Sequence, residues 1–210
     1  MLESPEAAVF GSYIDEYLID PEGVHHEFSQ DHGLHGQKID CDKIPDNSEI
    51  FESWVDVNVA AIKRLFPNRP NVLLSVDSGT NRLVAPVAKR VGYGAVALMT
   101  KKVSKNQVEL DDEAKARIGA MQDPNIVVLE DVASEGTSSA SAVRECRALG
   151  SDAIVLNTIQ RSTRLIRLDE IGAKYYPIVL KLLPNYTPEE CRSIGYCAAG
   201  WELIPHASKH

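Results

Sequence analysis

One short segment, Ile126 to Ser138 (IVVLEDVASEGTS), constrains the fold of this chain more than any other. Its four leading apolar residues are typical of a strand that is buried on both faces of a parallel sheet. Glu130 and Asp131 then emerge at the carboxyl end of this strand, where open α/β sheets bind their ligands. The small residues that follow open a helix, and a helix N-terminus suits a phosphate monoester. The segment therefore predicts a strand, an acidic pair and an anion-binding loop in one unit.

Helical and extended patterns alternate along most of the remaining chain. Helices are predicted for residues 5–18, 48–65, 81–91, 110–121 and 137–149, and further strands for residues 72–76, 95–99, 153–158 and 176–180. Strands joined by helices of this length need right-handed crossovers, which place the helices on the faces of the sheet. We therefore predict an α/β fold with a parallel central sheet flanked by helices.

Composition argues against several classes of protein. No apolar run approaches the roughly 18 residues of a membrane helix, and the first residues lack the basic and apolar blocks of a signal peptide. A formal net charge of -8 argues against a broad nucleic-acid surface. The four cysteines are too widely spaced to resemble a disulfide framework. We therefore expect one cytoplasmic domain spanning residues 1–210, with neither a membrane nor a nucleic acid as partner.

The segment from Ile126 resembles the signature of the type I phosphoribosyltransferases, in which hydrophobic residues precede two acids and a loop of small residues. The resemblance implies that Glu130 and Asp131 hold the ribose hydroxyls of phosphoribosyl pyrophosphate (PRPP). It also implies that the loop binds the 5-phosphate, through Ala133, Ser134, Glu135, Gly136, Thr137 and Ser138. Glu135 departs from the family's small residue. Its carboxylate is tolerated beside a phosphate only if the side chain points to solvent while its N–H faces the ligand.

A second loop follows the strand at residues 72–76 and is similar to the pyrophosphate loop of the same family. Its candidate binding residues are Asp77, Ser78, Gly79 and Thr80. Small residues bring main-chain N–H groups close to a polyanion, and the helix that follows adds a favourable dipole. The resemblance further implies a cis peptide bond in this loop, for which Ser78–Gly79 is the candidate.

A third loop carries three lysines and resembles the mobile basic loop of orotate phosphoribosyltransferases. Lys101, Lys102 and Lys105 occupy its basic positions, and Gln107 stands where the family has histidine. Breaking the bond at C1 of PRPP leaves negative charge on the departing pyrophosphate, so cations on a closing loop stabilise the transition state. We expect these lysines and Asp131 to be the catalytic residues, with Lys105 in direct contact with the leaving group.

The base site is predicted from two weaker resemblances. Arg161 follows the strand at residues 153–158 and is similar to the family's base-binding arginine, whose guanidinium matches a carboxylate in two hydrogen bonds. Residues 20–46 are polar and lack periodicity, and within them the segment around Lys38 resembles the hood of orotate phosphoribosyltransferases. The stacking aromatics of that hood are missing near Ile39 and Asp40, which weakens the prediction of orotate itself.

Histidines and cysteines also gather in two places. His25, His26, His32 and His35 fall within one polar segment, but their spacing matches no standard zinc pattern, so solvent-exposed side chains are expected. Cys191 and Cys197 are separated by five intervening residues with no second pair nearby, which favours buried thiols over a zinc site. No side chain is therefore predicted to be a metal ligand.

Taken together, the motifs imply a phosphoribosyltransferase that moves ribose 5-phosphate from PRPP to a nucleobase, a pyrimidine such as orotate, and releases pyrophosphate. Mg²⁺ is the implied cofactor, carried largely by the oxygens of the substrate and by water. The family also implies a homodimer. The alternative function is a regulator that binds PRPP or nucleotide on the same fold without turnover, which would explain Glu135 and Gln107.

Overall fold

The computed structural model describes residues 4–28, 33–66, 68, 70–92, 94–104 and 107–205, and for Asp77 and Ser78 it describes the backbone alone. Its centre is a five-stranded sheet in which every neighbouring pair of strands is parallel. The strand order is β4-β3-β7-β8-β9. These strands are β3 (Val72–Ser75), β4 (Val96–Leu98), β7 (Ile126–Ala133), β8 (Ala153–Gln160) and β9 (Tyr175–Leu180). The predicted parallel α/β sheet is confirmed.

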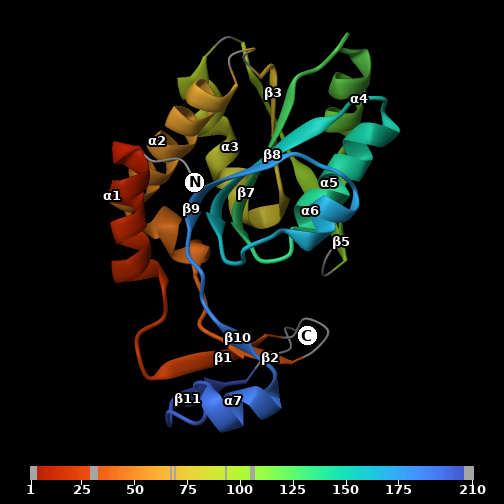
Figure 1. Ribbon diagram of the computed structural model, residues 1–210. Helices are drawn as coiled ribbons and strands as arrows, with labels where there is room; N and C mark the ends of the chain where they lie inside the picture. The colour runs from red at the N-terminus through yellow and green to blue at the C-terminus, as the bar shows by residue number, and fades with distance from the viewer. Residues whose placement is uncertain are drawn as a thin grey trace.

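Helices cover both faces of this sheet (Figure 1). One face packs against α1 (Pro5–Tyr13), α2 (Ser48–Leu65) and α3 (Asp77–Val91), with a π-helical turn, η1 (Ile14–Leu18), after α1. The other face packs against α4 (Asp112–Ala120), α5 (Thr137–Ala148) and the short α6 (Ile166–Glu170). No helix in the described ranges is long and apolar enough to cross a membrane.

Two core clusters result from the alternation of side chains along the strands. Leu73 and Val127 belong to the cluster under α2 and α3, whereas their neighbours Leu74 and Val128 belong to the cluster under α4 and α5. Because both faces are covered, β3 and β7 are apolar at successive positions rather than at alternate ones. This explains why the sequence of these strands is a continuous hydrophobic run.

A second, four-stranded sheet lies beyond the carboxyl edge of the central sheet (Figure 1). Its strand order is β10-β2-β1-β11, from β1 (Val24–Phe28), β2 (Leu34–Gly36), β10 (Asn185–Tyr186) and β11 (Glu202–Ile204). We call this sheet, together with α7 (Pro188–Ile194) and the turn 195–200, the hood. Residues 20–46 were predicted to form a hood by themselves. The structure adds the C-terminal segment to it, because β11 pairs with β1 and β10 pairs with β2.

Two further segments differ from the prediction. The 3-10 helix η2 (Cys41–Asp46) belongs to the predicted hood segment, yet its Cys41 and Ile44 pack into the main core. The lysine-rich loop contains a two-stranded antiparallel hairpin, β5 (Thr100–Ser104) and β6 (Gln107–Leu110). Residues 105–106, which include Lys105, lie outside the described residues. The basic segment is therefore a hairpin rather than an unstructured loop over its described part.

Candidate functional site

A cavity of about 210 Å³ lies at the carboxyl end of β7, at the start of α5. It is lined by the predicted phosphate loop, Ala133 to Ser138, together with Glu130, Val132 and Arg161. Gly136 makes the turn possible because its φ of 77° is a left-handed conformation that a residue with a Cβ adopts only at a cost. The structure thus brings together every residue that the sequence assigned to the phosphate loop.

Three carbonyl groups of this loop accept hydrogen bonds from neighbouring segments of the protein. The amide of Arg161 donates to the carbonyl of Ala133 (2.9 Å), and that of Arg167 donates to the carbonyl of Glu135 (3.0 Å). The Ser162 hydroxyl donates to the carbonyl of Ser134. In contrast, none of the amides of residues 134–138 donates a hydrogen bond to another described residue. These amides, at the positive end of the α5 dipole, are available to an anion in the cavity.

Glu135 is the one loop residue whose charge opposes an anion. Its half-exposed carboxylate lies 3.7 Å from Nε of Arg167, which offsets part of its charge, and both residues also line a second cavity, of about 580 Å³. The sequence required the Glu135 side chain to point to solvent, and its half-exposure is compatible with that requirement.

The two acids of β7 lie on opposite sides of the strand because successive strand residues alternate. Glu130 is buried, lines the cavity and accepts a hydrogen bond from the hydroxyl of Ser139. Asp131 faces α3 instead, and its Oδ1 accepts from the amide of Val132 at 2.7 Å. A Cβ added at Gly79 would collide with the Asp131 carboxylate, so the absence of a side chain at Gly79 allows the two to approach. The acidic pair therefore lies between the N-termini of α5 and α3.

The second predicted loop begins α3 earlier than expected. Asp77, Ser78 and Gly79 form the first turn of the helix, and the described part of the chain contains no cis peptide bond, so the expected cis bond at Ser78–Gly79 is wrong. Thr80 is fully buried and its hydroxyl donates to carbonyls of β7 and of the residue before α3, each at 3.0 Å. The Thr80 side chain therefore holds the turn in place, and only its backbone can serve a ligand.

Arg161 joins the central sheet to the hood. Its Nη2 donates to the carbonyl of Gln37 (2.7 Å), and its guanidinium lies 5.0 Å from the centroid of the Phe28 ring. Its Nε is buried and has no partner among the described residues. Burial lowers the pKa of the Arg161 guanidinium below its ordinary value, yet an arginine keeps its charge at neutral pH. Arg161 is thus a buried cation that lines both the first cavity and the larger one beside it.

A larger cavity of about 580 Å³ adjoins the first one and is open to both the hood and the sheet edge. Phe28, Leu34 and Asn185 line it from the hood, and Ser134, Thr137 and Arg161 line it from the edge of the sheet. The sequence did not identify Phe28 or Leu34 as site residues. The two cavities share Arg161 and part of the loop, so together they form one continuous site with an anion end and a mixed apolar and cationic end.

Neither a family model nor a curated protein matches this chain. Solved structures do: orotate phosphoribosyltransferase from Aeropyrum pernix is 16% identical, with a TM-score of 0.64 over 82% of this chain and 93% of that one. The chain has the type I phosphoribosyltransferase fold. Adenine phosphoribosyltransferase from Saccharomyces cerevisiae is also 16% identical, with a TM-score of 0.60 over 81% and 99%. The orotate enzyme of Mycobacterium tuberculosis, solved with inorganic phosphate, is 14% identical, with a TM-score of 0.58 over 84% and 96%.

Some residues predicted from the phosphoribosyltransferase resemblance lie away from the cavities. Lys101 and Lys102 are exposed on β5 and belong to the lining of neither cavity. Lys38 is partly exposed and forms an ion pair with Asp40 at 3.1 Å. The structure therefore places these three cations around the site rather than in it, and Lys105 lies outside the described residues.

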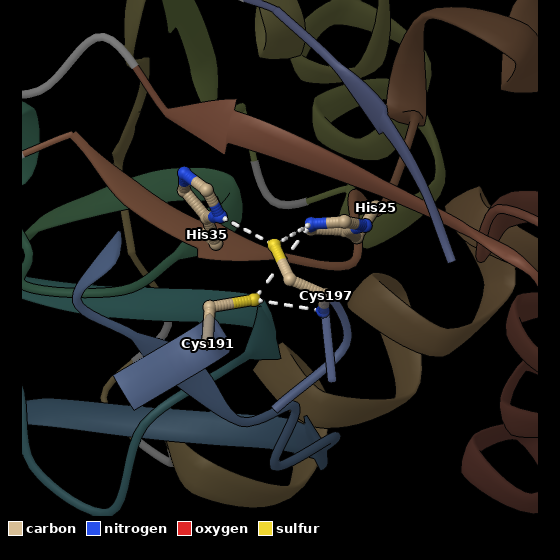
Figure 2. A group of neighbouring side chains, drawn as sticks. All are labelled: His25, His35, Cys191 and Cys197. Atoms are coloured by element: carbon tan, nitrogen blue, oxygen red, sulfur yellow. Dashed lines mark hydrogen bonds between the residues drawn. The ribbon is translucent and has the colours of Figure 1, made fainter. Parts of the chain in front are cut away.

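A group of side chains that sequence reasoning separated is brought together in the hood of this phosphoribosyltransferase fold. His25 of β1, His35 of β2, Cys191 of α7 and Cys197 of the following turn form it, and Figure 2 shows them pointing toward one another. The expectation of exposed histidines is wrong for His25 and His35, which are 0% and 5% exposed. The prediction of a buried thiol is confirmed for Cys191. Neither the histidine pair nor the cysteine pair indicates this cluster by itself, because the two pairs come from opposite ends of the chain.

Proposed function

We propose that this chain is a phosphoribosyltransferase that moves ribose 5-phosphate from PRPP to a ring nitrogen of a nucleobase and releases pyrophosphate. The observation that carries the proposal is the loop of residues 133–138, which lines a cavity at the carboxyl edge of a phosphoribosyltransferase fold and whose amides at 134–138 donate to no other described residue. A phosphate monoester fits the charge and the donors of this cavity.

Each part of PRPP has a group of suitable chemistry nearby. The 5-phosphate would accept from the loop amides, and the ribose hydroxyls would donate to Glu130 and Asp131, which lie between the two helix N-termini. The pyrophosphate would lie at the first turn of α3, residues Asp77 to Thr80. Lys101, Lys102 and Lys105 would then neutralise the leaving group when the β5–β6 hairpin closes.

Mg²⁺ is the cofactor that we infer for this reaction. Asp131 suits it, because one carboxylate oxygen accepts from a backbone amide and the other faces Gly79 at the start of α3. A hydrated Mg²⁺ on the pyrophosphate takes oxygen ligands of this kind and supplies positive charge to the leaving group. The protein's part would be to orient the substrate against this ion through Asp131.

The larger cavity is our proposed base site. Phe28 offers an aromatic face and Leu34 an apolar one, so a planar base would be held between the hood and the sheet edge. The guanidinium of Arg161 lines this cavity and suits a carboxylate or a carbonyl on that base, which favours a pyrimidine such as orotate over adenine. We also expect a cytoplasmic location. The chain should form a homodimer, which light scattering on the purified protein would test.

The experiment is a turnover assay with PRPP, Mg²⁺ and one base at a time, in which released pyrophosphate is measured. We expect release with orotate and none with adenine. Release with adenine alone would overturn the role of Arg161 but keep the enzyme. PRPP binding by calorimetry, without release under any base, would favour the alternative function, a regulator that senses PRPP. The absence of binding would overturn both functions.

A further inference from the structure

The His/Cys cluster, defined as His25, His35, Cys191 and Cys197, has no part in the phosphoribosyl chemistry above. Each of its residues offers one ligand atom, and these four atoms all lie within 4.8 Å of one another. The Sγ of Cys197 is 3.3 Å from Nε2 of His25 and 3.4 Å from Nδ1 of His35. The Sγ of Cys191 is 3.7 Å from the same Nε2. Four soft donors therefore converge on one point (Figure 2).

Three of these distances are close to the nitrogen–sulfur edge of a zinc tetrahedron. With Zn–S near 2.3 Å and Zn–N near 2.0 Å, a tetrahedral site places nitrogen and sulfur ligands about 3.5 Å apart. The three nitrogen–sulfur distances observed, 3.3, 3.4 and 3.7 Å, lie around this value. Two thiolates and two neutral imidazoles also cancel the charge of a divalent ion, so the buried site would be neutral. Among common metals, an S₂N₂ tetrahedron favours zinc.

The turn between the two cysteines is built for a thiolate. The backbone amide of Cys197 donates to the Sγ of Cys191 at 3.2 Å, which stabilises negative charge on that sulfur. Gly195 makes the turn compact, because a Cβ there would lie only 2.7 Å from the Tyr186 ring and 2.8 Å from Cα of Cys191. The hydrogen bond between the two cysteines and the close backbone approach at Gly195 hold Cys191 and Cys197 in one orientation, as a pre-formed ligand pair requires.

The hood lies outside both apolar core clusters, and its own ring contacts join only Tyr186, Tyr196 and Trp201 among the described residues other than histidine. Neither of the two core clusters among the described residues includes any residue of β1, β2, β10, β11 or α7. Instead, the His/Cys cluster occupies the centre of the hood, and the ring of Tyr196 lies 5.6 Å from that of His25. Sheets this small need another source of stability, and a structural metal is a standard one.

We propose that the His/Cys cluster binds one structural zinc ion, which joins the N-terminal and C-terminal segments of the hood. The ion would tie β1 and β2 to α7 and the following turn, across more than 150 positions in the sequence. The hood supplies Phe28 and Leu34, and β2 leads directly into Gln37, whose carbonyl accepts from Arg161, so the zinc would act on the site by positioning this wall. None of its ligands would touch the substrates.

The test measures metal directly on the full chain, expressed without an affinity tag in zinc-supplemented medium. We expect about one zinc per chain by elemental mass spectrometry, as for a closed four-ligand site. Replacement by Co²⁺ should give the visible absorption of tetrahedral cobalt with thiolate ligands. The Cys197→Ser and Cys191→Ser variants should each hold at least fivefold less zinc than the wild type.

Cys146→Ser is the matched control, because Cys146 is a buried free thiol in α5 that belongs to the core rather than to the cluster. It should keep its zinc even if it loses stability. If the cluster variants do not fold, the wild-type chain still decides: chelation should lower its melting temperature and zinc should restore it. The proposal would be overturned by a wild-type chain that holds no zinc and shows no thiolate–cobalt band. A disulfide between Cys191 and Cys197 in the purified wild type would also overturn it, as would a full zinc content in Cys197→Ser.

Discussion

The substitution Gly136→Ala tests the phosphate loop, because one methyl group acts there in two ways. The backbone of Gly136 has a φ of 77°, and a Cβ at that position would lie 3.1 Å from the side chain of Leu168 and 3.3 Å from Cβ of Leu165. Both leucines are fully buried, so neither can move aside freely. The loop itself must therefore shift, and its amides move with it.

Gly150 provides a matched control. Its φ is 80°, and a Cβ there would meet nothing within 4 Å. Gly150→Ala should therefore carry only the cost of a left-handed alanine, about 1–2 kcal/mol. Gly136→Ala should carry the same cost and a further ~1–2 kcal/mol from overpacking against the two leucines. In a chain of this length these costs correspond to losses in melting temperature of about 5 °C for Gly150→Ala and about 10 °C for Gly136→Ala.

The assay is thermal unfolding of each variant with and without PRPP and Mg²⁺. PRPP at about 100 times its dissociation constant should stabilise the wild type and Gly150→Ala by about 2.7 kcal/mol, seen as a rise in melting temperature. A shifted loop with about tenfold weaker binding should cut that stabilisation by roughly half. Equal losses of stability in the two variants, with the same rise on adding PRPP, would refute both the packing argument and the loop's role.

Four further substitutions test the remaining site residues. Asp131→Asn should weaken PRPP binding about tenfold in calorimetry, since a charged acceptor for the diol is lost, and unchanged affinity would contradict that role. Lys105→Ala should lower kcat at least about tenfold with little change in KM for PRPP; equal effects on both would argue against transition-state contact. Arg161→Lys keeps the positive charge but loses the planar guanidinium. The KM for orotate should therefore rise about tenfold while the KM for PRPP stays constant. A rise in both KM values would show a general loss of structure. Glu135→Gln removes an exposed ion pair and should shift the melting temperature by less than about 2 °C without weakening PRPP binding, and weaker binding would show that the carboxylate helps to hold the loop.

The elements of the central sheet were predictable because each is a local pattern. The helix at residues 48–65 appears with the predicted bounds, since its apolar residues recur at helical spacing and a strand follows directly. The start of α3 was missed by four residues. There the hydroxyl of Thr80 bonds to a carbonyl of β7, a partner 49 positions away that no local pattern contains.

The hood was only partly predictable, because its strands are short and partly polar. β2 and β11 have three residues each and β10 has two, which is too little for a period of alternation to be recognised. Phe28 of β1 was also missed as a cavity residue. Its role depends on the pairing of β1 with strands from the other end of the chain and on the position of Arg161.

The sequence by itself determined the order of strands and helices in the central sheet and placed the acidic pair and the loop of residues 133–138 at its edge, because strand, acids and loop are adjacent along the chain and share one local geometry. Only the tertiary structure decided which of the two acids meets α5 and which meets Gly79 of α3, and that two histidines meet two cysteines in the hood. The His/Cys cluster arises from the packing of segments more than 150 positions apart, where the spacing of residues in the sequence carries no information about distance.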